Sequence, residues 1–489
     1  MKTYLVVYFG SAVLAVLITP LLIWLDGRLG LANDPHHRHV HERPVPRIGG
    51  VAIFLSMIAL TIPVLFLSNT VGEAFREILG KLIVLLCAAG FILFVGLIDD
   101  LKAHGLGARL KFAAQLTAAL AVCAAGIRIQ SVTVADSLTL DFGWFPWPLT
   151  LLWIVGITNA VNLSDGLDGL AAGISAVACG VIAIFAVHSG NVVMAVLMLA
   201  LLGSLTGFLF FNFNPAKIFM GDCGSMFLGF TLASSSVLCL IKSSVLVGLA
   251  LPILALGIPI CDTLFSMIRR FLERRSMFAP DRSHFHHRLV DLGLKHHHVV
   301  IIIYVITLLA AGMGLFMMFS HNGRSLMVFF SALLLLIFVF RFLGGVQLKE
   351  MIAGLQRKYA IRQREHAETK NFEDAELHFR RAQTFEQWWK AISVAAEKMD
   401  FLSLRLPVKH RDGTQRTLTW RQKAGSHDSQ DGLLQANIPV RDRRSGSSLN
   451  LKIEVFKNGS LESAGRRIAL FTRLMEEHDI ANLVRKKKD

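Results

Sequence analysis

The sequence is poor in charge. Only 17% of its 489 residues are Asp, Glu, Lys or Arg, whereas 53% are apolar, and the mean hydropathy is +0.53. Soluble domains usually carry about 25% charged residues. This shortage excludes an ordinary soluble fold for most of the chain and indicates a protein that spans a lipid bilayer.

Several other features are missing. The six cysteines form no CxxC pair and lie in or beside apolar segments, so they indicate neither a disulfide framework nor a zinc site. Lys and Arg outnumber Asp and Glu by 50 to 35, but no basic surface interleaved with aromatics accompanies the excess, so we expect no nucleic-acid partner. A transporter is expected to repeat its topology in two halves, and we find no such repeat in this sequence. The first apolar segment lacks a convincing cleavage site, and we interpret it as a retained helix rather than a signal peptide.

What the chain does contain is a series of apolar segments, most of them long enough to cross a bilayer. They lie at about 4–25, 48–68, 80–98, 109–127, 146–161, 168–188, 191–211, 224–241, 244–268, 299–319 and 325–343. The sequence therefore predicts an all-α polytopic membrane protein with about 11 transmembrane helices. Lys and Arg gather after the first, third and ninth segments. By the positive-inside rule the odd-numbered loops and the C-terminus are cytoplasmic, and the N-terminus is periplasmic.

The chain changes character after Phe342. We predict a transmembrane domain over 1–343, a charged helical linker over 344–383, and a small cytoplasmic α+β domain over 384–489 with four alternating strand-like runs. Nothing in this last domain looks catalytic. Two roles stay open for it: a regulatory or protein-interaction module, or a passive domain whose basic residues touch anionic lipid.

The most informative stretch is NAVNLSDGLDGLAAG, which lies between two apolar segments. Asn159, Asn162, Asp165 and Asp168 recur at every third position. A carboxylate deep in a bilayer costs about 2.5–3.5 kcal/mol, so the two aspartates are functional candidates. We expect a helix end that opens into a loop, with these side chains converging. The alternative is a glycine-rich turn with ordinary caps.

Other acidic residues lie at predicted cytoplasmic membrane boundaries. Asp99 and Asp100 end the third segment, and such a pair can bind a cation, contact a phosphate, or simply mark a helix end. Asp222 is flanked by glycines, which let backbone amides approach a phosphate or a metal. Mg²⁺ prefers oxygen ligands supplied by one or two carboxylates plus substrate phosphates. These acids predict metal-assisted phosphoryl chemistry.

Basic and imidazole side chains complement the acids. Arg282, His284, His286 and His287 crowd the long loop after the ninth segment, a set suited to a diphosphate and a polar sugar. A zinc site is the alternative for the histidines. Arg43 and Arg47 flank a proline-fixed turn before the second segment. Asp262, within the ninth segment, is expected to support the site structurally, with an arginine as its candidate partner.

Five motifs in this order, RPVPRIGG, GLIDDLK, NAVNLSDGLDGLAAG, FNFNPAKIFMGDCGS and PDRSHFHHRLVDLG, resemble the polyprenyl-phosphate N-acetylhexosamine-1-phosphate transferase family. The resemblance covers about residues 1–343 and leaves the C-terminal domain unexplained. The PDRSHFHHRL loop is similar to the branch that uses UDP-N-acetylglucosamine or a related UDP-sugar.

The resemblance implies transfer of a sugar 1-phosphate from the UDP-sugar to undecaprenyl phosphate, with release of UMP and a need for Mg²⁺ or Mn²⁺. It implies Asp222 as the principal metal ligand with Asn162 as a second candidate, and Asp99, supported by Asp100, as the group that activates the lipid phosphate. One departure is Ala103, where the family often has a third acid.

The remaining roles also follow from the resemblance. Asp165 and Asp168 would order the nucleotide end of the pocket. Substrate contacts are implied for Asn159, Asn162, Arg43 and Arg47, for Arg109 or Lys111 on the lipid phosphate, and for Arg282, His284, His286 and His287 on the diphosphate or sugar.

Several alternatives stay open. The donor could instead be UDP-N-acetylmuramoyl-pentapeptide, or the chain could be a lipid-binding or transport relative without chemistry. The resemblance places the chain in the bacterial inner membrane with a cytoplasmic active site, and it leaves a homodimer, the sugar epimer and the downstream polymer undecided. Direct attack of the lipid phosphate is favoured over a phosphoryl-enzyme because it needs only positioning and charge neutralisation.

Overall fold

The structure of the protein is a computed structural model. It describes residues 1–29, 45–102, 104–135, 138–141, 143, 145–242, 246–272, 284–319, 323–343, 356, 363, 369–370, 372–409, 414–422, 433–441, 448–456 and 461–478. The chain divides into two compact units, Met1–Met351 and Ile352–Asp489. Each unit is described by itself below.

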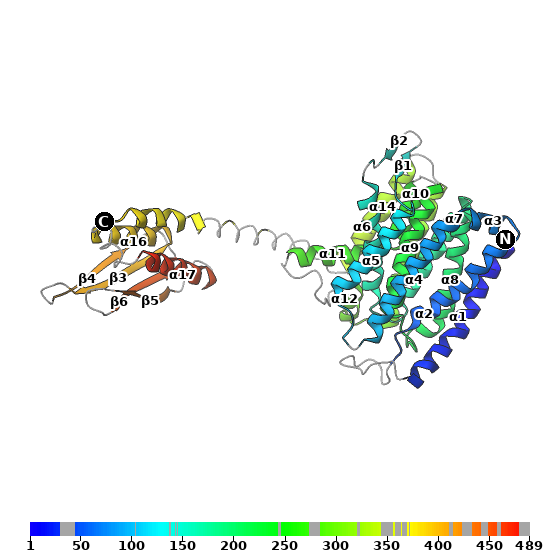
Figure 1. The fold of residues 1–489 in the computed structure, drawn as a ribbon, viewed down its shortest axis with the longest axis horizontal. Helices are drawn as coiled ribbons and strands as arrows, with labels where there is room; N and C mark the ends of the chain where they lie inside the picture. Colours follow the sequence, from blue (N-terminus) through cyan, green and yellow to red (C-terminus); the bar gives the residue numbers. More distant parts are fainter. Residues whose placement is uncertain are drawn as a thin grey trace. The chain divides into compact units, whose positions relative to one another are not determined.

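The first unit is a bundle of helices with one small hairpin (Figure 1). Its elements are α1 (Lys2–Leu29), α2 (Gly49–Thr61), the 3-10 helix η1 (Ile62–Phe66), α3 (Thr70–Glu77), α4 (Leu79–Leu101), α5 (Ala108–Ala124), β1 (Ser131–Ala135), β2 (Leu138–Asp141), α6 (Pro146–Ser164), α7 (Leu170–His188), α8 (Val192–Asn212), α9 (Gly221–Lys242), α10 (Leu246–Ala255), α11 (Gly257–Leu272), α12 (Phe285–Asp291), α13 (His296–Met318) and α14 (Gly323–Leu343).

Helices occupy every one of the predicted apolar segments, so the prediction of a mostly helical, multi-pass membrane protein is confirmed. Among the described residues, seven helical stretches are long and apolar enough to cross a membrane. The ninth predicted segment is broken, because α10 and α11 meet at an angle of 73°; counted as one span, they make an eighth. The total of about eleven spans and their orientation remain predictions.

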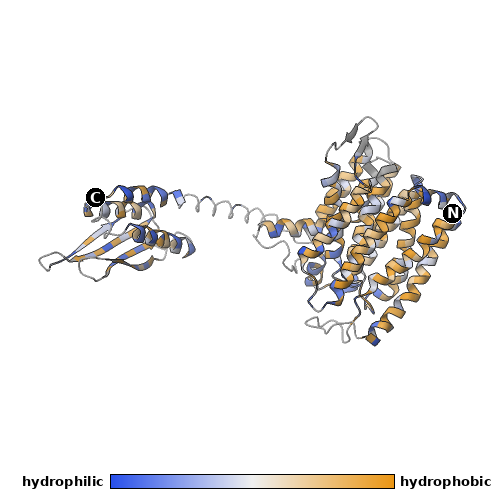
Figure 2. Cartoon of the chain, viewed as in Figure 1, coloured by the Kyte–Doolittle hydropathy of each residue, from blue (hydrophilic) through white to orange (hydrophobic). Residues whose placement is uncertain are grey.

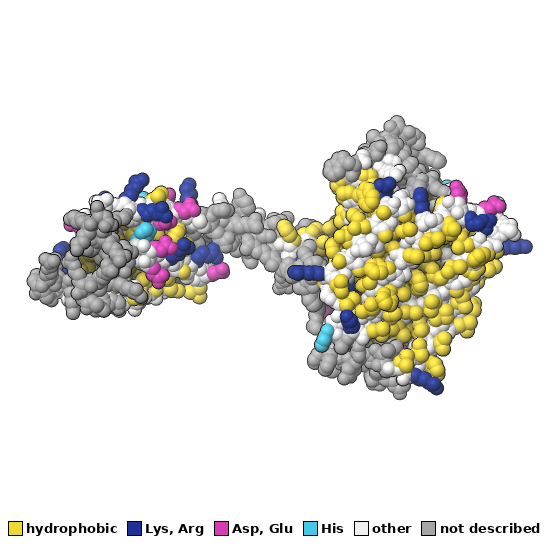
Figure 3. Space-filling view, viewed as in Figure 1, with side chains coloured by type: hydrophobic (Ala, Val, Ile, Leu, Met, Phe, Trp, Pro, Cys, Tyr) yellow, Lys and Arg dark blue, Asp and Glu magenta, His cyan; other side chains and the backbone are white. Residues whose placement is uncertain are grey.

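The outer surface of this unit is apolar. Hydrophobic side chains cover the middle of the face in Figure 3, and the helices are coloured as hydrophobic along most of their length in Figure 2. Phe66, Leu152 and Phe210 are each more than 70% exposed. Exposed apolar area of this extent is unfavourable in water, and it fits contact with lipid chains.

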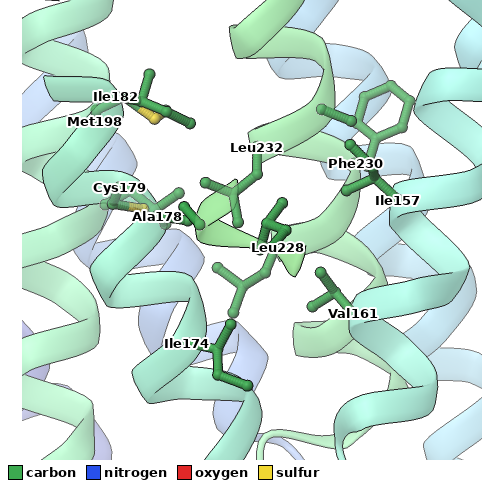
Figure 4. Close-up of a cluster of buried hydrophobic side chains, with 14 of the residues drawn as sticks. Ile157, Val161, Ile174, Ala178, Cys179, Ile182, Met198, Leu228, Phe230 and Leu232 are labelled. Carbon is green, nitrogen blue, oxygen red and sulfur yellow. The ribbon is translucent and has the colours of Figure 1, made fainter. Parts of the chain in front are cut away.

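Helix α9 forms much of the interior. Its side chains Leu228, Phe230 and Leu232 lie among residues of α6, α7 and α8 such as Ile157, Ile182 and Met198 in Figure 4. Some polar groups in these apolar helices bond to their own helix: the Thr158 hydroxyl, for example, donates to the carbonyl of Ile154 at 2.6 Å. The buried hydroxyls of Thr231, Ser234 and Ser235 in α9 have no hydrogen-bond partner among the described residues. A helix packed on several sides has a fixed position, and this fixes where its first residues lie.

Glycines bring the first turn of α9 against two other helices. A Cβ placed on Gly50 of α2 would lie 2.3 Å from the Cα of Gly224, and one on Gly96 of α4 would lie 2.5 Å from the Cα of Cys223. Neither position has room for a side chain, so α2 and α4 approach α9 at backbone distance. The end of α4 and the start of α9 are therefore adjacent.

The β1–β2 hairpin was not predicted. Its strands pair antiparallel, with Val132 opposite Leu140. The hairpin follows α5, which starts just after the end of α4, so it lies at the other end of the bundle from Asp99. Figure 1 shows it at the same end as the N-terminus. The described loops after the odd-numbered predicted segments share the opposite end.

The second unit is a four-stranded antiparallel sheet with helices. Its elements are α16 (Phe385–Lys398), β3 (Phe401–Lys409), β4 (Gln415–Arg421), β5 (Leu433–Arg441), β6 (Ser448–Phe456) and α17 (Leu461–Glu477), in the strand order β4-β3-β6-β5. Trp388 of α16 and Phe471 of α17 are fully buried in its core, and the ring of Phe471 lies 4.8 Å from that of Phe401. The predicted small α+β fold is confirmed, and the antiparallel pairing is a finding of the structure. Much of the predicted linker over 344–383 lies outside the described residues.

Candidate active site

Three carboxylates meet at the end of the bundle opposite the hairpin. Asp99 and Asp100 end α4, and Asp222 lies in the first turn of α9. One oxygen from each lies within 4.8 Å of the others. The segments that carry them are more than a hundred residues apart in the chain, and the close packing of α4 on α9 brings them together.

Lys111 and Asn162 complete this cluster. The Lys111 ammonium, from the first turn of α5, lies 2.7 Å from Asp222 Oδ2 and 3.2 Å from Asp99 Oδ2. The Asn162 amide of α6 donates to Asp222 Oδ1 at 3.2 Å and to the hydroxyl of Ser225 at 2.9 Å. Both oxygens of Asp222 thus have partners, so its orientation is fixed.

Asp100 has a different environment from Asp99. Its two oxygens accept hydrogen bonds from the backbone N–H groups of Asp222 and Cys223, both at 2.9 Å. Those amides belong to the first turn of α9 and have no partner within that helix. Asp100 is therefore a capping group supplied by another helix. The amides that we expected to be available to a phosphate are already occupied by this carboxylate.

The NLSDG motif forms the helix end and turn that we predicted. Helix α6 ends at Ser164, and the turn over 165–169 leads into α7. Burial raises the pKa of Asp165 to about 7, and the nearby charges of Asp222 and Asp100 add to the effect. Asp168 points elsewhere: it accepts from the Asn214 amide at 2.9 Å and from the Ala216 N–H at 3.1 Å.

Contrary to our expectation, the side chain of Asn159 also does not converge with the others of this motif. Its amide donates to Gln115 Oε1 of α5 at 2.6 Å and to the Val155 carbonyl at 2.8 Å. Gln115 was missed by sequence reasoning, as were Ser225, Asn214 and Tyr304, whose hydroxyl donates to the Gly169 carbonyl. Each is an isolated polar residue in or beside an apolar segment, and that was the available signal.

The histidines that we predicted in a loop reach the same turn, but His284 is the residue before α12, and His286 and His287 lie within this short helix. A Cβ on Gly166 would lie 2.3 Å from His286 Nε2, so this imidazole packs directly on the turn backbone. Burial lowers the pKa of His286 to about 3, and the ring is therefore neutral. The rings of His286 and the half-buried His287 are 4.3 Å apart. Of the three histidines, His286 is unsuited to supply positive charge to a diphosphate.

Of the four predicted arginines, the structure describes two. Arg47, before α2, and Arg109, in the first turn of α5, are exposed at the same end of the bundle as the carboxylates. The carbonyl oxygen of Arg47 lies beside Gly221 at the start of α9. Arg43 and Arg282 lie outside the described residues.

The carboxylate cluster fits a divalent metal ion. Asp99, Asp100 and Asp222 offer hard oxygen donors from a compact group, which is the donor chemistry that Mg²⁺ and Mn²⁺ prefer. Asn162 already contacts Asp222 and could add an amide oxygen after rotation of its side chain. No cysteine belongs to this group of described residues, and it has no zinc-like donor set.

Comparison with known proteins gives a consistent result. The family model described as glycosyl transferase family 4 matches residues 82–240, which include Asp99, Asp165 and Asp222. A probable undecaprenyl-phosphate N-acetylglucosaminyl 1-phosphate transferase of Bacillus subtilis is 41% identical over 293 residues, which cover 60% of this chain and 78% of that protein.

Two further relatives extend this comparison. A decaprenyl-phosphate N-acetylglucosaminephosphotransferase of Mycobacterium leprae is 35% identical over 311 residues, 58% of this chain and 76% of that protein. A phospho-N-acetylmuramoyl-pentapeptide-transferase of Halalkalibacterium halodurans is 33% identical over 296 residues, 57% of this chain and 87% of that protein. The chain belongs to the polyprenyl-phosphate N-acetylhexosamine-1-phosphate transferase family.

Proposed function

We propose that this protein transfers N-acetylglucosamine 1-phosphate from UDP-N-acetylglucosamine to undecaprenyl phosphate and releases UMP. The observation that carries the proposal is the group of three carboxylates with Lys111 at one end of an apolar helical bundle. A lipid phosphate reaches such a place from the bilayer, and a nucleotide sugar reaches it from the aqueous side. The names of the relatives from Bacillus subtilis and Mycobacterium leprae support the same reaction.

The choice of sugar rests on sequence similarity. Identity is 41% to the relative named for N-acetylglucosaminyl 1-phosphate and 33% to the relative named for the muramoyl-pentapeptide. The PDRSHFHHRL loop points the same way. The product would be the first lipid-linked sugar of a cell-surface polysaccharide.

A divalent metal, Mg²⁺ or Mn²⁺, is part of the proposal. Asp222 would hold it, with Asn162 or Asp99 as a further ligand, and the bound ion would supply charge neutralisation to the phosphate oxygens. Lys111 adds a fixed positive charge at the same point. Both contributions lower the repulsion between two anionic substrates.

Asp99 is our choice for the group that orients and activates the lipid phosphate. One oxygen accepts the backbone N–H of Leu106, and the other accepts from Lys111. It is thus held at the boundary between α4 and the loop that leads to α5. Direct in-line attack of the lipid phosphate on the diphosphate of the UDP-sugar then requires only that these two groups be aligned. Asp165 and the histidine loop would bind the nucleotide and sugar end.

The proposed site is on the cytoplasmic side of the inner membrane. Support comes from Arg47, Lys102, Arg109 and Lys111, which lie at the same end of the bundle as the three carboxylates. The N-terminus and the β1–β2 hairpin lie at the other end. An excess of basic residues is typical of the cytoplasmic ends of membrane proteins.

The decisive experiment uses the purified full chain with undecaprenyl phosphate, Mg²⁺ and separate UDP-sugar donors, with UMP release as the readout. We expect turnover with UDP-N-acetylglucosamine that stops when EDTA is added and returns with Mg²⁺. Turnover with UDP-N-acetylmuramoyl-pentapeptide alone would assign the protein to the other branch. No release from any donor, by protein that still binds the lipid phosphate, would favour a relative without chemistry.

A further inference from the structure

A carboxylate outside the cluster of Asp99, Asp100 and Asp222 holds the described part of the histidine loop, at the start of α12. Asp262 lies in α11 and is 8% exposed, in a segment that is otherwise largely apolar. Its Oδ2 lies 3.0 Å from His284 Nδ1, and its Oδ1 accepts the backbone N–H of Phe285 at 2.9 Å. A buried carboxylate is costly unless it is paired in this way. Both of its oxygens bind the residues that begin α12.

The start of α12 is also fixed on its apolar side. Phe285 is buried, and its ring lies 4.5 Å from the ring of Phe340 in α14. Phe340 in turn stacks on Phe265 of α11 at 5.8 Å. Asp262 and Phe265 are one turn apart on α11, so one helix face holds both the polar and the apolar side of this junction.

From this junction the contacts lead to the proposed donor pocket. The ring of His284 is parallel to the ring of His286 at 5.8 Å, and both residues are at most 5% exposed. His286 packs on Gly166, the residue after Asp165. His286 Nε2 is buried and has no hydrogen-bond partner among the described residues. A series of contacts thus connects Asp262 to the turn that carries Asp165.

We propose that Asp262 is the positioning residue of the donor pocket: it keeps the proton of His284 on Nδ1, leaves Nε2 for the nucleotide sugar, and aligns His286 with the Gly166 turn. A carboxylate accepts but does not donate, so the neighbouring ring nitrogen must carry the proton. This inference rests on the proposed function, because it assigns the histidine loop to the UDP-sugar.

Asp262→Asn is the informative change. The new side chain has nearly the same shape and keeps an oxygen for the Phe285 N–H, but its amide group would donate to His284 Nδ1 and so reverse the tautomer. We expect the KM for the UDP-sugar to rise about 10- to 100-fold, the size of effect seen for groups that orient metal-binding histidines. The KM for undecaprenyl phosphate should change less than about twofold, and the melting temperature should stay close to that of the wild type.

A double-mutant cycle separates positioning from general damage. In a His284→Gln background, Asp262→Asn should add less than about a threefold further loss, because the group on which it acts is gone. Equal increases in the KM values of both substrates, or losses that simply multiply, would overturn the proposal. So would unchanged kinetics in Asp262→Asn.

Binding of UMP to the full-length protein, measured by calorimetry, provides a readout without turnover. Weaker UMP binding by Asp262→Asn supports the positioning role even if the wild type fails to transfer the sugar, in which case only the proposed function is wrong. Unchanged UMP binding, together with normal donor KM in an active enzyme, would leave the function intact and reject the role of Asp262.

Discussion

The Lys111 ammonium lies 2.7 Å from a carboxylate oxygen of Asp222, although the two residues are 111 positions apart and belong to different helices. The same ammonium also contacts Asp99. It therefore offsets the repulsion of an acidic cluster that would otherwise be costly to assemble. The Lys111 charge would compete with a divalent metal ion for these carboxylates, and it would also help the ion to neutralise the substrate phosphates.

Replacing Lys111 with Met should separate metal binding from catalysis. We expect tighter Mn²⁺ binding, because a competing cation is removed, and transfer slowed by about a hundredfold, because a charge that stabilises the phosphates is lost. Mn²⁺ binding by electron paramagnetic resonance and UMP release measure the two effects. Lys81→Met is the matched control, since Lys81 is at the other end of α4. Weaker Mn²⁺ binding in Lys111→Met would contradict this prediction.

Replacing Asp222 with Ala should abolish transfer and retain the fold. The Asp222 carboxylate contacts the side chains of Lys111 and Asn162. Unlike the Asp100 carboxylate, it accepts no hydrogen bond from the backbone of another helix among the described residues. We expect activity to fall by at least about a thousandfold, which corresponds to about 4 kcal/mol. Metal titrations should show much weaker Mn²⁺ binding. Normal turnover at limiting Mg²⁺ would show that Asp222 is not the metal ligand.

Replacing Asp100 with Asn should mainly affect stability. An amide presents only one acceptor oxygen to the two N–H groups of Asp222 and Cys223, so one buried donor loses its partner. We expect a loss of about 1–3 kcal/mol in the free energy of unfolding and a lower melting temperature. Asp291→Asn, at an exposed carboxylate that ends α12, should have little effect. Equal melting temperatures for both variants would exclude the capping role.

Asp165 should make stability depend on pH. Burial raises its pKa to about 7, against 3.8 as an ordinary value, so the folded state resists ionisation of this group. Ionisation is therefore a cost above pH 7, and the cost declines as the pH falls from 7 towards 4. With EDTA present, Asp165→Asn should melt at a higher temperature than the wild type at pH 8, and the difference should shrink by pH 5. A difference in melting temperature that grows as the pH falls would contradict this prediction.

Removing residues after Leu343 should leave the transferase intact. All the described site residues lie in the first unit, and the second unit has a hydrophobic core of its own. We expect kcat/KM within about twofold of the full chain for both substrates. A well-folded truncated protein with altered kinetics would instead assign a regulatory role to the α+β unit.

The positions of the long apolar helices follow from the sequence, because a bilayer requires long apolar segments whose backbone is satisfied internally. The short helices α3 and α12 and the break between α10 and α11 were not predicted. The strands of the second unit also follow from the sequence, where the alternation in FLSLRLPV matches β3. Asp99, Asp165 and Asp222 were identifiable as candidates because charge is costly at a membrane boundary. The β1–β2 hairpin escaped prediction, although its alternating SVTVADSLTLD pattern was visible.

Tertiary structure decided which of these polar groups act on each other. Asp100 caps α9, Asn159 meets Gln115, and Asp262 holds His284, and none of these pairings can be read from spacing. Each depends on how one helix is rotated about its axis against another. That rotation is set by local packing, such as the contact of Gly50 with Gly224, and not by the hydropathy of either segment.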